Sequence, residues 1–86
     1  MSAITTTQFS VDGTAVKIAS SQGSPLEVHI HSKGQVFISG TSAVTSSTGL
    51  QLDNGDKTIL TIPDNTELWC IANGGTYTVQ VMAITL

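Results

Sequence analysis

Two histidines, His29 and His31, stand two residues apart, and imidazole nitrogens are common ligands for transition metals. Residues two apart on a β-strand share a face, so both rings could bind one ion. Two ligands do not complete a site, although three copies around a three-fold axis would supply six imidazoles for an octahedral ion. The alternation of these histidines with Leu26, Val28 and Ile30 accounts for their spacing without a metal. We therefore predict no metal site in the single chain.

An acidic segment, Asp53-Asn54-Gly55-Asp56, resembles the opening of a calcium-binding loop. It lacks the later ligands and the terminal glutamate that such a loop requires. Asn-Gly is also a frequent hairpin-turn dipeptide. The segment is therefore predicted to be a turn that needs no ion.

The chain has a single cysteine, Cys70, which lies between Trp69 and Ile71 in its most apolar run. A reactive thiolate needs a basic or dipolar neighbourhood, which this run does not offer. We predict a buried structural cysteine and no disulfide within the chain. No glycine-rich phosphate loop, catalytic carboxylate pair or metal-ligand cluster is present. The sequence thus indicates neither an enzyme nor a bound cofactor.

Trp69 is the only tryptophan, and its sequence context leaves three interpretations open. It could belong to the core, with its indole N–H bonded at the edge of the core. It could lie on a surface that another subunit covers. It could also form a sugar-stacking platform with Tyr77, as in a glycan-binding β-sandwich module.

Short apolar runs separated by turn residues cover most of the chain. The predicted strands are 8–11, 14–19, 26–31, 35–39, 50–52, 57–62, 68–72 and 76–84. The run 68–72 is apolar on both faces, which is typical of a central strand. No segment has the apolar spacing of an amphipathic helix. The predicted fold is therefore all-β: a small antiparallel β-sandwich or barrel of seven to eight short strands, jelly-roll or Greek-key-like.

Eighty-six residues predict a single β domain over 1–86, in which 1–7 form a flexible arm, a swapped arm or an edge strand. Three lysines, no arginine and six acidic residues argue against nucleic-acid binding, because phosphate contacts rely on basic side chains. No apolar run approaches membrane-spanning length, and no signal peptide is evident, so we expect a protein made in a cytoplasm.

Several strands carry apolar residues on both faces, which leaves apolar side chains without an obvious place in one small core. The residues concerned are Phe37, Trp69, Ile71, Met82 and Ile84. An exposed patch of this kind is unusual on a soluble monomer. A chain this short that cannot form an internal disulfide also gains stability from association. We therefore predict that these five residues form an oligomer interface.

From residue 28 onward the chain contains a series of strand and loop motifs, in the segments Ile30–Gly40, Val44–Leu52, Ile59–Ile62, Glu67–Ala72 and Thr76–Val81. They include a strand of the form V-aromatic-I/L-x-G, a V-T-x-S-T-G-L/F-x-L loop, an E-L-aromatic-A-I-A strand and a closing strand. In these motifs the chain resembles small virion proteins of tailed phages. Cys70 stands where family members commonly have alanine.

This resemblance implies a structural virion protein of the capsid decoration (cement) type, which binds the outer capsid surface and stabilises the shell. It further implies a homotrimer that contacts the major capsid protein, is located on the virion and is assembled in the host cytoplasm. Neither nucleic acid nor a membrane is an expected partner. The alternative is a glycan-binding or receptor-binding β-sandwich module of a phage tail fibre or spike.

Overall fold

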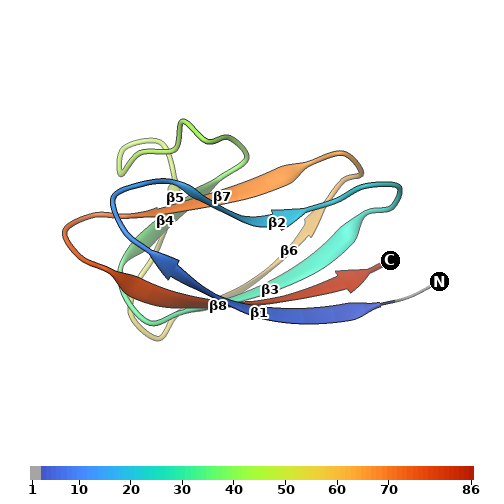
Figure 1. The fold of residues 1–86 in the computed structure, drawn as a ribbon, viewed down its shortest axis with the longest axis horizontal. Helices are drawn as coiled ribbons and strands as arrows, with labels where there is room; N and C mark the ends of the chain where they lie inside the picture. Colours follow the sequence, from blue (N-terminus) through green and yellow to red (C-terminus); the bar gives the residue numbers. More distant parts are fainter. Residues whose placement is uncertain (1–2) are drawn as a thin grey trace.

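Residues 3–86, which the computed structural model describes, form eight β-strands (Figure 1). The strands are β1 (Ile4–Val11), β2 (Val16–Ser20), β3 (Leu26–Ser32), β4 (Val36–Ser39), β5 (Leu50–Leu52), β6 (Lys57–Ile62), β7 (Glu67–Ala72) and β8 (Tyr77–Thr85). The described residues contain no helix, and hence none that could span a membrane. The all-β prediction is confirmed.

The strands form two four-stranded antiparallel sheets that face each other (Figure 1). Sheet A has the order β1-β8-β3-β6, and sheet B has the order β2-β7-β4-β5. The nested pairs β1 with β8, β2 with β7, β3 with β6 and β4 with β5 define a jelly roll. This order resolves the alternatives that the sequence left open, and it places β7 inside sheet B, as the two-sided apolar run predicted.

The chain is in effect one long two-stranded ribbon folded over on itself. Ile4 pairs with Ile84, Leu26 with Ile62, and Val36 with Leu52. The two members of each pair lie equally far along the chain from Val44. Only the β2–β7 pairing departs from this symmetry, through a register shift between Lys17 and Ala19. The centre of the ribbon therefore lies in the connection between β4 and β5.

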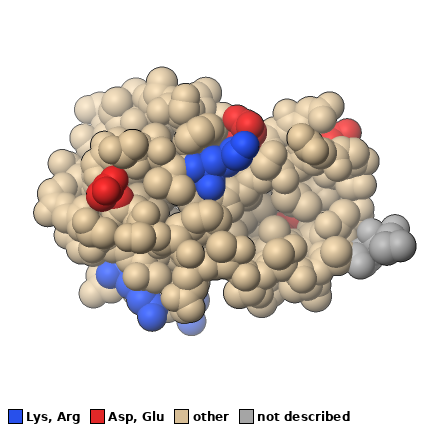
Figure 2. Space-filling model, in the orientation of Figure 1, with Lys and Arg blue, Asp and Glu red and all other residues tan. Residues whose placement is uncertain are grey.

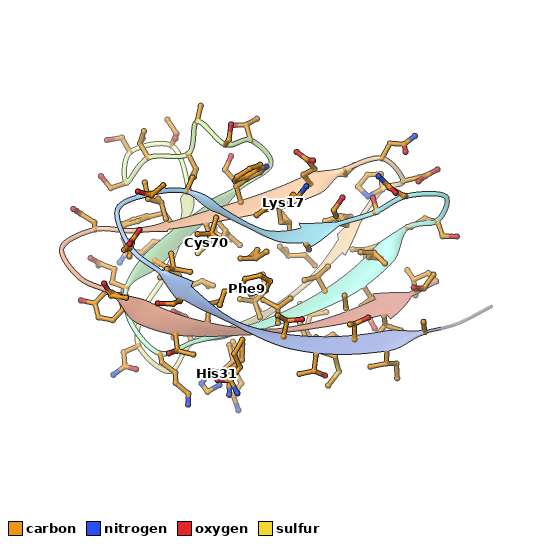
Figure 3. All side chains as sticks on the ribbon, viewed as in Figure 1. Phe9, Lys17, His31 and Cys70 are labelled. Carbon is orange, nitrogen blue, oxygen red and sulfur yellow. The ribbon has the colours of Figure 1, made fainter. Side chains whose placement is uncertain are left out.

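Alternate residues of the strands fill the space between the two sheets. The core consists of Val11, Ile18, Val28, Ile30, Val36, Ile38, Leu52, Ile62, Leu68, Cys70, Ala72, Val79 and Val81, with Phe9 and Tyr77 among the partly buried residues packed against it. Figure 3 shows Phe9 and Cys70 between the sheets, while His31 and Lys17 point outward on opposite sides. Each sheet therefore has an inner apolar face and an outer face.

The connection between β4 and β5 covers part of the outer face of sheet B. Val44 is 3% exposed, and a Cβ placed on Gly49 would lie 2.7 Å from the Phe37 Cβ and 2.9 Å from the Val44 Cγ2. Phe37, on the outer side of β4, is consequently only 5% exposed. The prediction that Phe37 is an uncovered interface residue is therefore wrong for the single chain, because its own connection already covers it.

The turn predicted at 53–56 is present, and two other tight turns also contain a residue with a positive φ angle. Gly55, Asn65 and Gly74 have positive φ angles of 87°, 59° and 89°. The backbone N–H of Asp53 donates to the Asp56 carboxylate at 2.8 Å, so this acidic pair holds its own turn.

Residues 4–7, part of the predicted arm, lie in β1 at one edge of sheet A. The pairing with β8 of the same chain runs without interruption from Ile4 to Val11. Residues 1–2 of the predicted arm lie outside the described residues. Within residues 4–7, the edge-strand alternative describes the structure.

Candidate interaction surface

The outer face of sheet A is a regular array of side chains from four strands. Three rows cross the strands: Gln8, Gln80, His31 and Lys57; then Thr6, Met82, His29 and Ile59; then Ile4, Ile84, Glu27 and Thr61. We call these twelve residues the sheet A face. Its acidic and lysine side chains are Glu27, in the third row, and Lys57, in the first, while its large apolar side chains lie in the second and third rows.

Apolar side chains on this face are open to solvent in the single chain. Ile4 is 67% exposed, Ile59 is 60% exposed and Met82 is 38% exposed, whereas Ile84 is half-buried. Ile4, Ile84 and Met82 are direct or diagonal neighbours on β1 and β8 and form one apolar surface, whereas His29 separates Ile59 from Met82. Met82 and Ile84 lie on this outer face, and their role in an oligomer interface stays a prediction. The prediction did not include Ile4 or Ile59, although the alternation of Ile59 with the inward-facing Leu60 and Ile62 is visible in the sequence.

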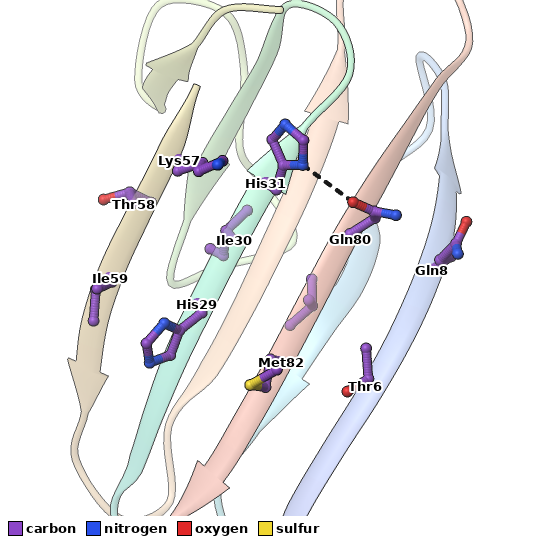
Figure 4. A pocket seen from close by; sticks show the side chains of 11 residues that line it. Thr6, Gln8, His29, Ile30, His31, Lys57, Thr58, Ile59, Gln80 and Met82 are labelled. Carbon is purple, nitrogen blue, oxygen red and sulfur yellow. Dashed lines mark hydrogen bonds between the residues drawn. The ribbon is translucent and has the colours of Figure 1, made fainter. Parts of the chain in front are cut away.

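A hollow of about 370 Å³ crosses the sheet A face (Figure 4). Its lining includes Thr6, His29, Ile59 and Met82, which come from four neighbouring strands. At its polar end, His31 Nδ1 and Gln80 Oε1 are 3.1 Å apart (Figure 4). Because the amide oxygen can only accept, this contact places a proton on Nδ1 and leaves Nε2 as the acceptor when the ring is neutral.

His29 and His31 point to the same side of β3, as the spacing predicted. His29 Nε2 lies 3.3 Å from Glu27 Oε2, which is ion-pair distance, but the two groups are not aligned as a hydrogen bond. The described residues contain no group of three or more histidine, cysteine or carboxylate side chains placed to hold a metal ion. The absence of a metal site in the single chain remains a prediction, which elemental analysis of the purified protein would check.

The outer face of sheet B carries Trp69 and Ile71, both half-buried. Trp69 pairs across the sheet with Lys17, and its Nε1–H donates to Glu67 Oε1 at 3.2 Å. The Lys17 Nζ is 3.5 Å from the other oxygen of the same carboxylate. The surface drawn in Figure 2 is otherwise largely uncharged. Trp69 is thus a fixed side chain on an outer face rather than a core residue.

Tyr77 is too differently placed to share a platform with Trp69. It begins β8 in sheet A and packs against the core, and a Cβ on Gly34 would lie 2.2 Å from its ring. Trp69 faces outward from sheet B. Of the interpretations left open for Trp69, the structure does not support a stacking platform with Tyr77, because the two residues belong to different sheets and point in different directions.

Cys70 is fully buried at the centre of sheet B, as predicted. Burial raises the pKa of its thiol from 9.0 to about 12, while a backbone hydrogen bond at Ile71 opposes this rise. A neutral, enclosed thiol is a poor nucleophile and cannot reach a thiol on another molecule. Cys70 has a packing role in this fold.

No family model matches the chain, and no curated protein matches its sequence. Its fold is similar to a solved structure from Bacillus endospore appendages, described as a novel family of disulfide-linked pili. The two share 18% identity with a TM-score of 0.67, over 100% of this chain and 88% of the other. A de novo designed double-stranded β-helix is also similar, with 13% identity and a TM-score of 0.59, over 94% of this chain and 97% of that one. At such identities the similarity concerns the fold.

Proposed function

We propose that this chain is a structural subunit that associates with copies of itself in a larger assembly. The observation that carries the proposal is the sheet A face, where Ile4 and Met82 are exposed as diagonal neighbours on β1 and β8, and Ile59 is exposed at the opposite edge, in a surface with few charges. Interface cores are depleted in charge and enriched in apolar side chains of this kind. Burying such a surface would also stabilise a domain too small to have a large core.

In its finer form, the proposal is a phage capsid decoration protein. Three copies would contact the major capsid protein on the outer shell of the virion, after assembly in the host cytoplasm. The segments that resemble small tailed-phage virion proteins support this form, and the jelly roll is an architecture found in viral capsid proteins. With three lysines and no arginine, binding to nucleic acid is not part of the proposal.

The pilus structure with the similar fold supports an assembly role only in its general form. Its description names disulfide-linked pili. The single cysteine of this chain is 0% exposed and cannot link subunits in this fold. We therefore propose contacts that are entirely noncovalent.

Two measurements test the proposal: the mass in solution by analytical ultracentrifugation, and co-sedimentation with shells that lack the protein. Met82→Lys places a charge in the middle of the sheet A face and is expected to weaken one or both interactions. Ser46→Lys adds the same charge to an exposed position between β4 and β5, and should behave as the wild type. A protein that stays monomeric at high concentration and never sediments with shells would contradict the proposal.

A further inference from the structure

The four edge strands of the two sheets differ in how well they are protected against pairing with another chain. In sheet B, β5 has only three residues, and β2 has a register shift and carries Lys17. Short, irregular and lysine-bearing strands are the usual protection of an edge. In sheet A, β1 pairs regularly over eight residues and contains no charged residue, glycine or proline. The other edge, β6, pairs regularly over six residues, with a single lysine at its start.

The free backbone groups of these two edges can be assigned from the hydrogen bonds of the sheet. The Thr85 N–H donates to the Ala3 carbonyl, and the Ser32 N–H donates to the Asp56 carbonyl. Hydrogen-bonded and non-hydrogen-bonded pairs alternate along antiparallel strands. It follows that Ile4, Thr6 and Gln8 of β1 direct their N–H and C=O groups away from β8. By the same alternation, Lys57, Ile59 and Thr61 of β6 direct theirs away from β3.

These six residues also share a face, because all of them belong to the sheet A face. Strand direction alternates across β1-β8-β3-β6, so a β1 placed beside β6 would again be antiparallel. The outward N–H and C=O groups of β6 in one copy can therefore pair with those of β1 in the next copy, in the antiparallel direction and in the register that sheet A already has. We propose that sheet A continues from one copy to the next, with β6 of one copy paired to β1 of its neighbour. This inference rests on the proposed self-association and identifies the contact that makes it.

The register that continues the three rows places Lys57 opposite Gln8 of the neighbouring copy, Ile59 opposite Thr6 and Thr61 opposite Ile4. Three such hydrogen-bonded pairs supply about six backbone hydrogen bonds. No like charges face each other across this pair, because β1 contains no charged residue. The two most exposed large apolar side chains on the sheet A face, Ile4 and Ile59, then become diagonal neighbours across the new pair. Pairing β1 with another β1 would leave Ile59 exposed, so the head-to-tail contact accounts for both edges.

Thr6→Pro and Ile59→Pro form a matched pair of test variants. Each removes one outward N–H and adds a ring at the edge, but neither breaks a hydrogen bond within sheet A, and proline is tolerated on edge strands. Far-UV circular dichroism and the unfolding midpoint verify the fold of each variant. Analytical ultracentrifugation over a concentration series then measures association. Each variant alone is expected to associate at least about tenfold more weakly than the wild type.

Mixing the two variants gives the decisive result. Thr6→Pro keeps an intact β6 edge, and Ile59→Pro keeps an intact β1 edge, so the mixture should form a complex of one copy of each and nothing larger. A wild type that is monomeric at every concentration, a Thr6→Pro variant that associates as the wild type does, or an unchanged mixture would each overturn the inference. Shell co-sedimentation is measured separately, so failure of this contact is distinguishable from failure of the proposed function.

Discussion

At the scale of single residues, several of the side chains that could do chemistry are either buried or bonded to other groups of the same chain. Cys70 is enclosed, His31 contacts Gln80, and the carboxylates of Glu67 and Asp56 hold neighbouring groups. Residue type and alternation were sufficient to predict that Cys70 is buried and that His29 and His31 lie on one face of their strand. It could not identify their partners, since Gln80 comes from a strand about fifty residues further along the chain.

The raised pKa of Cys70 predicts a loss of stability in alkali. The unfolded thiol loses its proton near pH 9, whereas the folded thiol keeps it until about pH 12. The unfolded state therefore binds fewer protons in this window, and the free energy of unfolding falls as pH rises. Denaturant titrations from pH 8 upward should show a steeper fall for the wild type than for Cys70→Ala. Parallel curves for the two proteins would contradict this expectation.

Hydrogen bonds of Ser21 join the loop after β2 to the turn before β7. Its Oγ accepts from the Thr66 N–H at 2.9 Å and donates to the Pro63 carbonyl at 2.5 Å, and the residue is 2% exposed. Ser21→Ala removes these hydrogen bonds from the Thr66 N–H and the Pro63 carbonyl and should lower the free energy of unfolding by about 0.5–1.5 kcal/mol. The neighbouring Ser20→Ala, at an exposed position, is the control and should change it by less than about 0.5 kcal/mol.

At the scale of strands, alternation alone predicted which side of β3 faces inward and why β7 is central. It could not show what covers each outer face. Phe37 and Ile71 are opposite each other on the outer side of sheet B, yet only Phe37 lies under the connection between β4 and β5. That difference depends on how an irregular segment folds back, which side-chain periodicity does not encode.

Trp69 gives a prediction at this scale. Its ring is half-buried against sheet B and not enclosed, so Trp69→Ala should cost about 1–2 kcal/mol of unfolding free energy in the single chain. A fully buried aromatic residue would cost about 3–5 kcal/mol. Chemical denaturation of dilute protein measures the intrachain part. A larger cost that appears only at high concentration would show that another copy covers the ring.

At the scale of the whole molecule, the order of strands could not be predicted. Each pair in the jelly roll joins segments placed symmetrically about Val44, and local patterns carry no information about such distant partners. Turn residues and alternation restrict the fold to a sandwich or barrel, and pairing between the ends of the chain decides the rest. The same topology determines how the chain must fold.

Pairing from the centre of the ribbon outward is the entropically cheapest route to this fold. The β4–β5 contact closes a short loop, and each later pair then extends an existing one, whereas β1 and β8 alone would have to close nearly the whole chain. We therefore expect folding in milliseconds to seconds, with the centre formed early.

Leu52→Ala, at the centre, should mainly slow refolding, and Phe9→Ala, in the last pair, should mainly speed unfolding. Stopped-flow fluorescence of Trp69 measures both rates. Leu52 is 6% exposed, so its truncation should cost about 2–5 kcal/mol, enough to apportion between the two rates. The reverse pattern, slow refolding of Phe9→Ala with little effect of Leu52→Ala, would mean that the ends meet first.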